Sequence, residues 1–292
     1  MDILVICDKQ DIVDIADAIR EKTGSTDNMT LEDMITAIEG FEVGGGDDNA
    51  FISLIKRDIT EMSNSTINVI GSYAFGHCEQ LTTVNMPAVT KIGKSAFQTC
   101  TNLIVASFPA ATSVGSNAFS NCTNLTTAKF PVATSMGSYA FANCIKLTEI
   151  SFPLVKTIDY CAFSSCSGLT TASFPAATRM GSYAFFCCSK LTAVSFPAVL
   201  NIGASAFRSC SSLTMVSLPA VSSIGNYAFS GCTMLISLYL TGSAICSLGG
   251  SKVFSSTPIG NGTGYIYVPS SLVASYKAAT NWTYYSNQIS AI

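Results

Sequence analysis

The sequence repeats itself every 22 residues over most of its length. A Phe, a Cys and a Leu recur together at that spacing, without an insertion between copies. A fixed period over so many copies predicts a solenoid, in which each repeat forms one coil that is stable only against its neighbours. The copies are marked by Phe75, Phe97, Phe119, Phe141, Phe163, Phe185, Phe207 and Phe229, by Cys78, Cys100, Cys122, Cys144, Cys166, Cys188, Cys210 and Cys232, and by Leu81, Leu103, Leu125, Leu147, Leu169, Leu191, Leu213 and Leu235.

Each repeat predicts a short strand followed by a turn. Residues 191–197 alternate apolar and polar side chains, which places Val194 and Phe196 on the inner face of a strand. Gly203 is expected to allow the chain to turn, and Phe207 then returns to the interior. Because a coil has one apolar side, it buries that side only by stacking, so Phe lies on Phe and Cys on Cys in successive coils.

The repeated pattern L-x-x-V-x-F-P-A-x-T-x-I-G-x-x-A-F-x-x-C resembles the BspA-like leucine-rich repeat family over roughly residues 59–269. The resemblance implies an α/β solenoid with a parallel β-sheet on its concave face, and recognition of surfaces as the usual role. The sequence departs from the pattern at several positions, of which three concern the turn Gly and the Thr. Asp159 replaces the turn Gly of its repeat, and Lys156 and Leu200 replace the usual Thr.

The first 43 residues predict a small helical hairpin of a different kind. Two segments, at 11–24 and 30–40, each place apolar residues on one helical face. Helices this short are marginal alone, so we expect them to dock on another protein. The stretch "IADAIREKTG…MTLEDMITAIEGF" resembles a short module at the front of tail and accessory proteins in phages and prophages of gut bacteria. That resemblance implies attachment to a tail or other virion protein.

The repeats end in atypical units, as solenoids need to cover their terminal coils. A degenerate first coil places Ile59, Met62 and Asn64 in register with Leu81, Val84 and Met86, and "GYIYVP" at 264–269 predicts a last strand six residues out of register. After it we expect a short helix, and then Trp282, Tyr284 and Tyr285 closing the core. The predicted parts are an N-terminal helical attachment module (1–43), a Gly-rich linker (44–50), the leucine-rich repeat solenoid (51–241) and a C-terminal capping unit (242–292).

The bulk composition disfavours several classes of partner. A net charge of −3 and a pI near 5.1 leave no basic surface for nucleic acid. No apolar run approaches the ~18 residues of a membrane helix, so membrane insertion is not expected. The start "MDILVICDKQ" lacks the basic and long apolar regions of a secretory signal, which favours assembly in the cytoplasm.

Catalytic chemistry is not expected either. His77 is the single histidine, and the carboxylates Glu79, Glu149 and Asp159 are isolated in sequence. We predict no enzyme activity, no cofactor and no metal site. Eight of the twelve cysteines belong to the periodic series, and we interpret them as buried free thiols. The ~4.8 Å spacing of stacked strands exceeds the ~3.8 Å between Cβ atoms that a relaxed disulfide prefers.

The candidate binding residues lie at the outward strand positions. Most of these positions hold Ser or Thr, but toward the C-terminal end they become bulky. Tyr and Met anchor many interfaces, and Tyr also stacks on sugars. The alternative interpretation is that Tyr is simply a favourable strand residue beside a cap. The predicted ligand-binding residues are Met215, Tyr239, Tyr265 and Tyr267.

Together these features predict a non-catalytic binding protein associated with the tail of a phage or prophage. The solenoid would recognise a host cell-surface glycan or protein, and the protein would enter the virion after cytoplasmic assembly. Two other interpretations stay open. One is a bacterial leucine-rich repeat adhesin, on the cell surface or secreted, and the other is a structural spacer that binds nothing. An oligomer is compatible with each of them.

Overall fold

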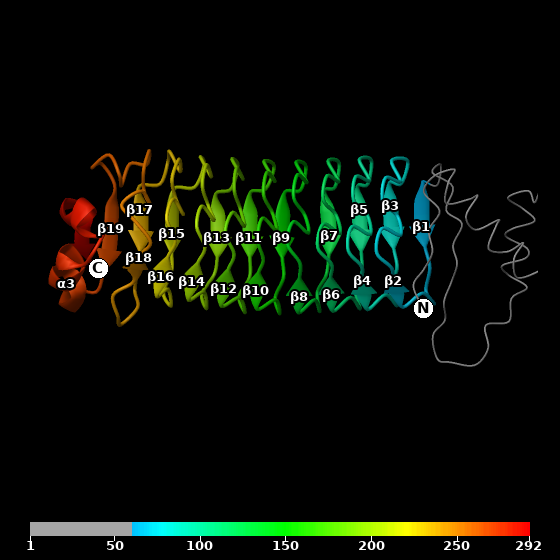
Figure 1. The fold of residues 1–292 in the computed structure, drawn as a ribbon, viewed down its shortest axis with the longest axis horizontal. Helices are drawn as coiled ribbons and strands as arrows, with labels where there is room; N and C mark the ends of the chain where they lie inside the picture. Colours follow the sequence, from blue (N-terminus) through cyan, green and yellow to red (C-terminus); the bar gives the residue numbers. More distant parts are fainter. Residues whose placement is uncertain (1–59) are drawn as a thin grey trace, which may run out of the picture.

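The computed structural model describes residues 60–292, which form a single stack of coils ending in a C-terminal cap (Figure 1). Each coil has three sides. The first carries a strand of three residues, or four in the last coil, the second carries a strand of two residues, and the third is a run of turns. We call these sides sheet 1, sheet 2 and the turn side. The predicted helical hairpin and linker lie outside the described residues.

Sheet 1 contains the strand that the repeat pattern predicts. Its strands pair in parallel with a shift of one repeat, so that Val84 pairs with Ala106 and Ala106 with Ala128. Met62 pairs with Val84, which confirms the register of the degenerate first coil, while Ile59 lies outside the described range. The strands are β1 (Glu61–Ser63), β3 (Thr83–Asn85), β5 (Val105–Ser107), β7 (Thr127–Lys129), β9 (Glu149–Ser151), β11 (Thr171–Ser173), β13 (Ala193–Ser195), β15 (Met215–Ser217), β17 (Ser237–Tyr239) and β19 (Tyr265–Val268).

Sheet 2 was not predicted, because two residues are too few to show an alternating pattern. It too is parallel throughout, and each strand buries one apolar residue, such as Ile92 or Ile202. The parallel-strand solenoid is therefore confirmed, with little helix in the part of the chain described. The strands are β2 (Val69–Ile70), β4 (Lys91–Ile92), β6 (Ser113–Val114), β8 (Ser135–Met136), β10 (Thr157–Ile158), β12 (Arg179–Met180), β14 (Asn201–Ile202), β16 (Ser223–Ile224) and β18 (Ser247–Leu248).

The interior is filled by two ladders of stacked phenylalanines. The periodic Phe residues stack face to face, for example Phe119 on Phe141 with ring centroids 5.2 Å apart and planes inclined by 6°. A second ladder follows sheet 1, as in Phe130 on Phe152 at 5.7 Å. The predicted inward position of the Phe series is thus confirmed. Both ladders are fully enclosed, so each coil contributes apolar area that only its neighbours cover.

The turn side depends on two left-handed residues in each repeat. They lie two positions before and two positions after the periodic Phe, with φ between 53° and 63° where the residue is not Gly. Gly and Asn adopt this region at low cost, but the set also contains Tyr139, Cys161 and Thr99, so the repeated packing of the coils imposes this conformation on residues that rarely adopt it. His77 occupies one of them (φ 61°) and is exposed at the surface. It is therefore a turn residue at the surface of its coil.

The periodic glycines act through close approach rather than through a left-handed turn. Gly203 directly follows the last residue of β14, and a Cβ atom placed on it would lie 2.5 Å from the carbonyl carbon of Gly181. Real Cβ atoms do not come that close to backbone. Glycine is therefore required here because the backbones of neighbouring coils touch, which differs from the turn that we expected.

The C-terminal cap closes the last coil with aromatic residues. It contains η1 (Ser270–Leu272), the short helix α3 (Val273–Ala278), η2 (Thr283–Gln288) and the strand β20 (Ile289–Ala291), which pairs with β19. Trp282 is buried and its Nε1–H donates to the Cys246 carbonyl (2.6 Å), and the Tyr285 hydroxyl donates to the Ser251 carbonyl (2.7 Å). The prediction for Tyr284 is wrong: η2 turns it outward, 68% exposed, and Tyr276 fills the interior instead.

Candidate binding surface on sheet 1

The structure brings three of the four predicted residues into contact on the outer face of sheet 1. The rings of Tyr239 on β17 and Tyr267 on β19 stack with centroids 4.7 Å apart and planes inclined by 15°. Tyr265 lies beside Tyr267 at 6.2 Å and is 49% exposed. We call Tyr239, Tyr265 and Tyr267 the tyrosine platform. The six-residue shift that we predicted before β19 is what aligns Tyr267 with Tyr239.

Met215 belongs to the same face but not to the same contact. It is 57% exposed on β15, and the register places it opposite Ser237, which in turn is opposite Tyr265. Two strand spacings, about 9.6 Å, therefore separate Met215 from Tyr265. The small side chain of Ser237 lies between the larger side chains of Met215 and Tyr265 in this row.

The outer ring faces of the stacked pair border small residues. In the row of Tyr239 and Tyr267, the next residue on the β15 side is Ser217, and the next on the β20 side is Ser290. A serine does not cover the face of a neighbouring tyrosine ring. The platform therefore offers ring faces for stacking, with hydroxyl groups that donate and accept hydrogen bonds.

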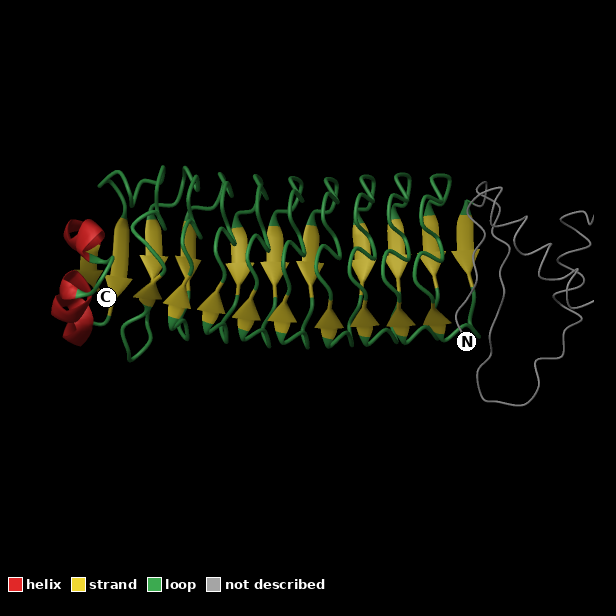
Figure 2. Cartoon of the chain, viewed as in Figure 1, coloured by secondary structure: helices red, strands yellow, loops and turns green. Residues whose placement is uncertain are grey.

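Sheet 1 is interrupted twice, which the repeat pattern did not predict. Figure 2 shows its strands in three groups, because β7 is not paired with β9, and β13 is not paired with β15. Within the described stack, Phe108 N–H donates to the Lys129 carbonyl and Phe152 N–H to the Ser173 carbonyl, both at 3.1 Å. The equivalent bond between Phe130 and Ser151 is absent.

The first interruption coincides with the repeat that departs most from the pattern. Sheet 2 is also broken there, between β8 and β10, directly before Asp159. A Cβ atom at this position has no room against the preceding coil, as the equivalent glycines show, so the coil of Asp159 cannot approach as closely as the others. At the position of Lys156, Thr134 and Thr178 each have a hydroxyl that donates a hydrogen bond to a backbone carbonyl of the preceding coil (3.2 and 3.4 Å). Lys156 cannot make this bond. No substitution accounts for the second interruption.

A groove lies where β7 and β9 separate. Its volume is about 580 Å³. Phe130 and Ile150 lie at its base, with hydroxyl residues and one Lys and one Glu around it. Most outward positions in this middle region hold Ser or Thr, which gave no sign of a groove, and Lys156 and Asp159 are the sequence signals that point to it. The lining residues are Thr126, Thr127, Ala128, Lys129, Phe130, Pro131, Glu149, Ile150, Ser151, Pro153, Thr171 and Ser173.

We call the first interruption, between β7 and β9 and between β8 and β10, the seam. The turn side of the stack stays continuous across the seam. Tyr139 N–H donates to the Tyr160 carbonyl (2.9 Å), and Phe141 N–H to the Ala162 carbonyl (2.8 Å). The rings of Tyr139 and Tyr160 also meet edge to face, with centroids 5.3 Å apart. A hydrogen bond to Tyr160 raises the pKa of Tyr139 to about 12. The two halves of the stack are thus joined by one bonded side instead of three.

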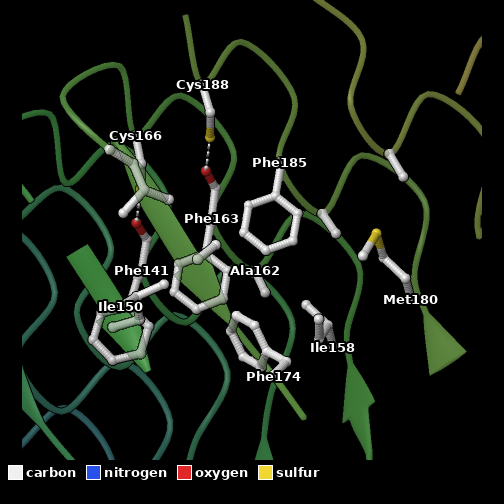
Figure 3. Packing of buried hydrophobic residues seen from close by; sticks show 14 of the residues in the cluster. Phe141, Ile150, Ile158, Ala162, Phe163, Cys166, Phe174, Met180, Phe185 and Cys188 are labelled. Carbon is white, nitrogen blue, oxygen red and sulfur yellow. Dashed lines mark hydrogen bonds between the residues drawn. The ribbon is translucent and has the colours of Figure 1, made fainter. Parts of the chain in front are cut away.

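The periodic cysteines link neighbouring coils through their thiols (Figure 3). Cys166 Sγ–H donates to the Phe141 carbonyl (3.0 Å), and Cys188 Sγ–H to the Phe163 carbonyl (3.2 Å). Burial raises the pKa of Cys210 well above its ordinary value, and that of Cys232 to about 12. The cysteine is therefore a hydrogen-bond donor in its neutral form, and not only the small apolar residue that we expected.

Two further features of residues 60–292 bear on function. No group of three His, Cys, Asp or Glu side chains in this range is placed to hold a metal ion. No helix among these residues combines the length and the apolar content that crossing a bilayer requires.

The comparisons with known proteins agree on the repeat architecture. The family model of the BspA type leucine rich repeat region matches residues 47–170 and 134–260, in six copies. No curated protein matches the chain. A leucine-rich repeat protein from Bacteroides ovatus is similar in structure, with 21% identity and a TM-score of 0.52 over 71% of this chain and 63% of that one. This chain therefore spans less than two thirds of that protein.

Two other solved structures align less closely. A leucine rich cell surface protein from Faecalibacterium prausnitzii aligns with 20% identity and a TM-score of 0.40, over 79% of this chain and 80% of that one. The T. pallidum leucine-rich repeat protein aligns with 26% identity and a TM-score of 0.46, over 60% and 78%. With the family model covering most of the stack, the chain belongs to the BspA-type leucine-rich repeat proteins.

Proposed function

We propose that this protein is a non-catalytic binding protein whose ligand lies against the tyrosine platform of sheet 1. Leucine-rich repeat solenoids are typically binding scaffolds rather than enzymes. The observation that carries the proposal is the stack of Tyr239 on Tyr267 with a serine on each side. Such a stack is already ordered before binding, so a ligand loses little side-chain entropy of the protein when it binds.

The ligand that we propose is a host cell-surface glycan or protein. Open tyrosine faces bordered by hydroxyl groups favour a glycan, whose rings present C–H groups to an aromatic face and hydroxyl groups at their edges. Met215 and Tyr265, both half exposed, would extend the contact along the sheet. Met215 and the tyrosine platform carry no charged side chain, so we propose a ligand that is neutral where it contacts them.

For the biological setting, we propose a phage or prophage tail, with residues 1–43 attaching the protein to a tail or other virion protein. The resemblance of those residues to tail-associated modules supports this, and the long stack of coils offers an extended surface for contact with a host. A bacterial surface or secreted adhesin is the second candidate, because a cell-surface protein is among the similar structures. A structural spacer is the third.

The test is a binding measurement with the whole chain on host envelope material, separated into glycan and protein fractions. Replacing Tyr239→Ala and Tyr267→Ser together should weaken binding at least tenfold, which is about 1.4 kcal/mol. The matched control is Asn85→Ala with Ser107→Ala, at equivalent outward positions on β3 and β5. Equal binding by both double variants would refute the platform, and no binding by the unchanged chain would favour the spacer.

A further inference from the structure

We propose that the groove between β7 and β9 is a second binding site, and that it takes a neutral oligosaccharide. The site is independent of the tyrosine platform: β7 and β9 belong to other sections of sheet 1 than β17 and β19. The groove has a volume of about 580 Å³, enough for a small number of sugar rings.

The walls of the groove offer unpaired backbone groups. At every paired position in the described stack, the residue after one strand donates its N–H to the next strand, as Phe152 does to Ser173 (3.1 Å). At the groove, Phe130 N–H and the Ser151 carbonyl have no such bond to each other. Exposed donors and acceptors at a sheet edge are available to another molecule. Hydroxyl groups of a sugar both donate and accept, so one ring satisfies both walls.

The base of the groove limits what can enter. Phe130 and Phe152 remain stacked at 5.7 Å, about the same separation as Phe108 and Phe130 at 5.5 Å. The core is therefore closed beneath the groove, and a complete peptide strand, which needs about 4.8 Å of additional spacing, does not fit between the coils. The ligand must lie on the outer face, where Pro131 and Pro153 offer apolar surface to the C–H groups of a sugar ring.

The charges around the groove favour a neutral ligand. Lys129 and Glu149 line it from the two opposing strands, and the other lining side chains are uncharged. The net charge of the lining is therefore zero, which disfavours both a phosphorylated and a strongly basic ligand. Thr127, Ser151, Thr171 and Ser173 add hydroxyl groups that hydrogen-bond to sugars without selecting a charge.

The site can be blocked without touching the platform. Ser151→Trp places a large ring over the groove, from an exposed position on the outer face of β9. Ser107→Trp is the matched control, since Ser107 has the same position in the repeat two coils earlier, where sheet 1 is continuous. A second variant, Asp159→Gly, removes the cause of the separation and should bring β9 back onto β7.

The experiment uses the full chain on an array of neutral oligosaccharides built from hexoses and N-acetylhexosamines, beside an array of uncharged decapeptides. We expect at least one oligosaccharide to lose tenfold or more in affinity with Ser151→Trp and with Asp159→Gly, and to keep it with Ser107→Trp. That oligosaccharide should also keep its affinity with Tyr239→Ala and Tyr267→Ser, which separates this site from the platform.

Three results would overturn the groove site. The first is that every oligosaccharide that binds the unchanged chain binds the Ser151→Trp variant with the same affinity. The second is that only decapeptides respond to it, which would make the groove a peptide site. The third is that no oligosaccharide binds at all. In the last case the tyrosine platform is tested separately, by the binding of the protein fraction of the host envelope.

Discussion

Asp159 and Gly181 occupy the same position in successive coils, and a Cβ atom on Gly181 would lie 2.8 Å from the carbonyl carbon of Asp159. The stack leaves no room for a side chain at this position. Asp159 has one, and at its coil both sheets separate from the coil before. We therefore attribute the seam and the groove to the Asp159 side chain, together with the hydroxyl that Lys156 lacks.

Replacing Asp159→Gly should therefore close the seam. Restored backbone hydrogen bonds contribute about 1 kcal/mol each, and a glycine costs up to about 1 kcal/mol of chain entropy, so we expect a net gain of roughly 1–2 kcal/mol in unfolding free energy. Hydrogen exchange at Phe130 N–H and Ser151 N–H should slow. Unchanged exchange at both amides would mean that Asp159 does not cause the separation.

The reverse change, Gly203→Asp, should create a second seam. The new Cβ atom would lie 2.5 Å from the carbonyl carbon of Gly181, so β12 and β14 should separate. We expect a loss of roughly 2 kcal/mol or more from about two broken hydrogen bonds and local strain. Urea unfolding with amide exchange measures both effects.

Gly231→Asn is the control for that variant. Gly231 has φ 75° on the turn side, where Asn121 and Asn143 hold the equivalent left-handed position, so the change should be nearly neutral. A variant of Gly203 that is as stable as this control would contradict the close-approach role.

Phe141→Ala should both destabilise the stack and separate its halves. The ring is fully buried between Phe119 and Phe163, and removing it should cost about 3–5 kcal/mol. Phe141 also lies on the turn side, the one side that bridges the seam. We expect two thermal transitions in calorimetry, one for each half of the stack.

Phe97→Ala provides the comparison, because its coil is paired on both sheets. This variant should lose a similar amount of stability. Its two halves should still unfold together, in one thermal transition. Two transitions in both variants, or in neither, would argue against the seam as the boundary between two folding units.

Alkaline pH should destabilise the protein steeply. Burial holds the pKa of Cys232 and Cys246 at about 12 in the folded chain, and raises that of Cys188 and Cys210 as well. Unfolded thiols lose their protons from about 8.5. The unfolded state therefore binds fewer protons above that pH, and stability falls as pH rises from about 8.5 toward 12.

Urea unfolding between pH 7 and 10 measures this slope. Cys232→Ala should reduce the slope as well as the stability at pH 7, whereas Phe97→Ala should reduce only the stability. A flat profile, or an identical slope in Cys232→Ala, would show that the buried thiols do not control the alkaline limit.

The cap shows where sequence patterns stop being informative. Trp282, Tyr284 and Tyr285 are adjacent aromatic residues with no period to separate them, and the η2 turn buries the first and last while exposing Tyr284. The short two-residue strands of sheet 2 were likewise invisible, since alternation needs a longer run. In each case the missing information is the direction of a short segment, which tertiary packing sets.

The tyrosine platform and the groove differ in how far the sequence located them. Tyr239 and Tyr267 follow from counting outward positions, once the six-residue shift before β19 is recognised. The groove follows from no outward residue at all. We attribute it to Asp159, which directly follows β10 of sheet 2, and it opens in sheet 1 because β9 and β10 belong to the same coil.

The sequence by itself determined the repeat, the inward residues and the row of outward tyrosines, because each of these repeats a local environment that one coil encodes. The tertiary structure decided how closely successive coils approach, where the sheets are interrupted and which cap residues are buried. Those features depend on contacts between backbones of different repeats, where a single Cβ atom such as that of Asp159 changes the spacing, and no pattern within one repeat contains that distance.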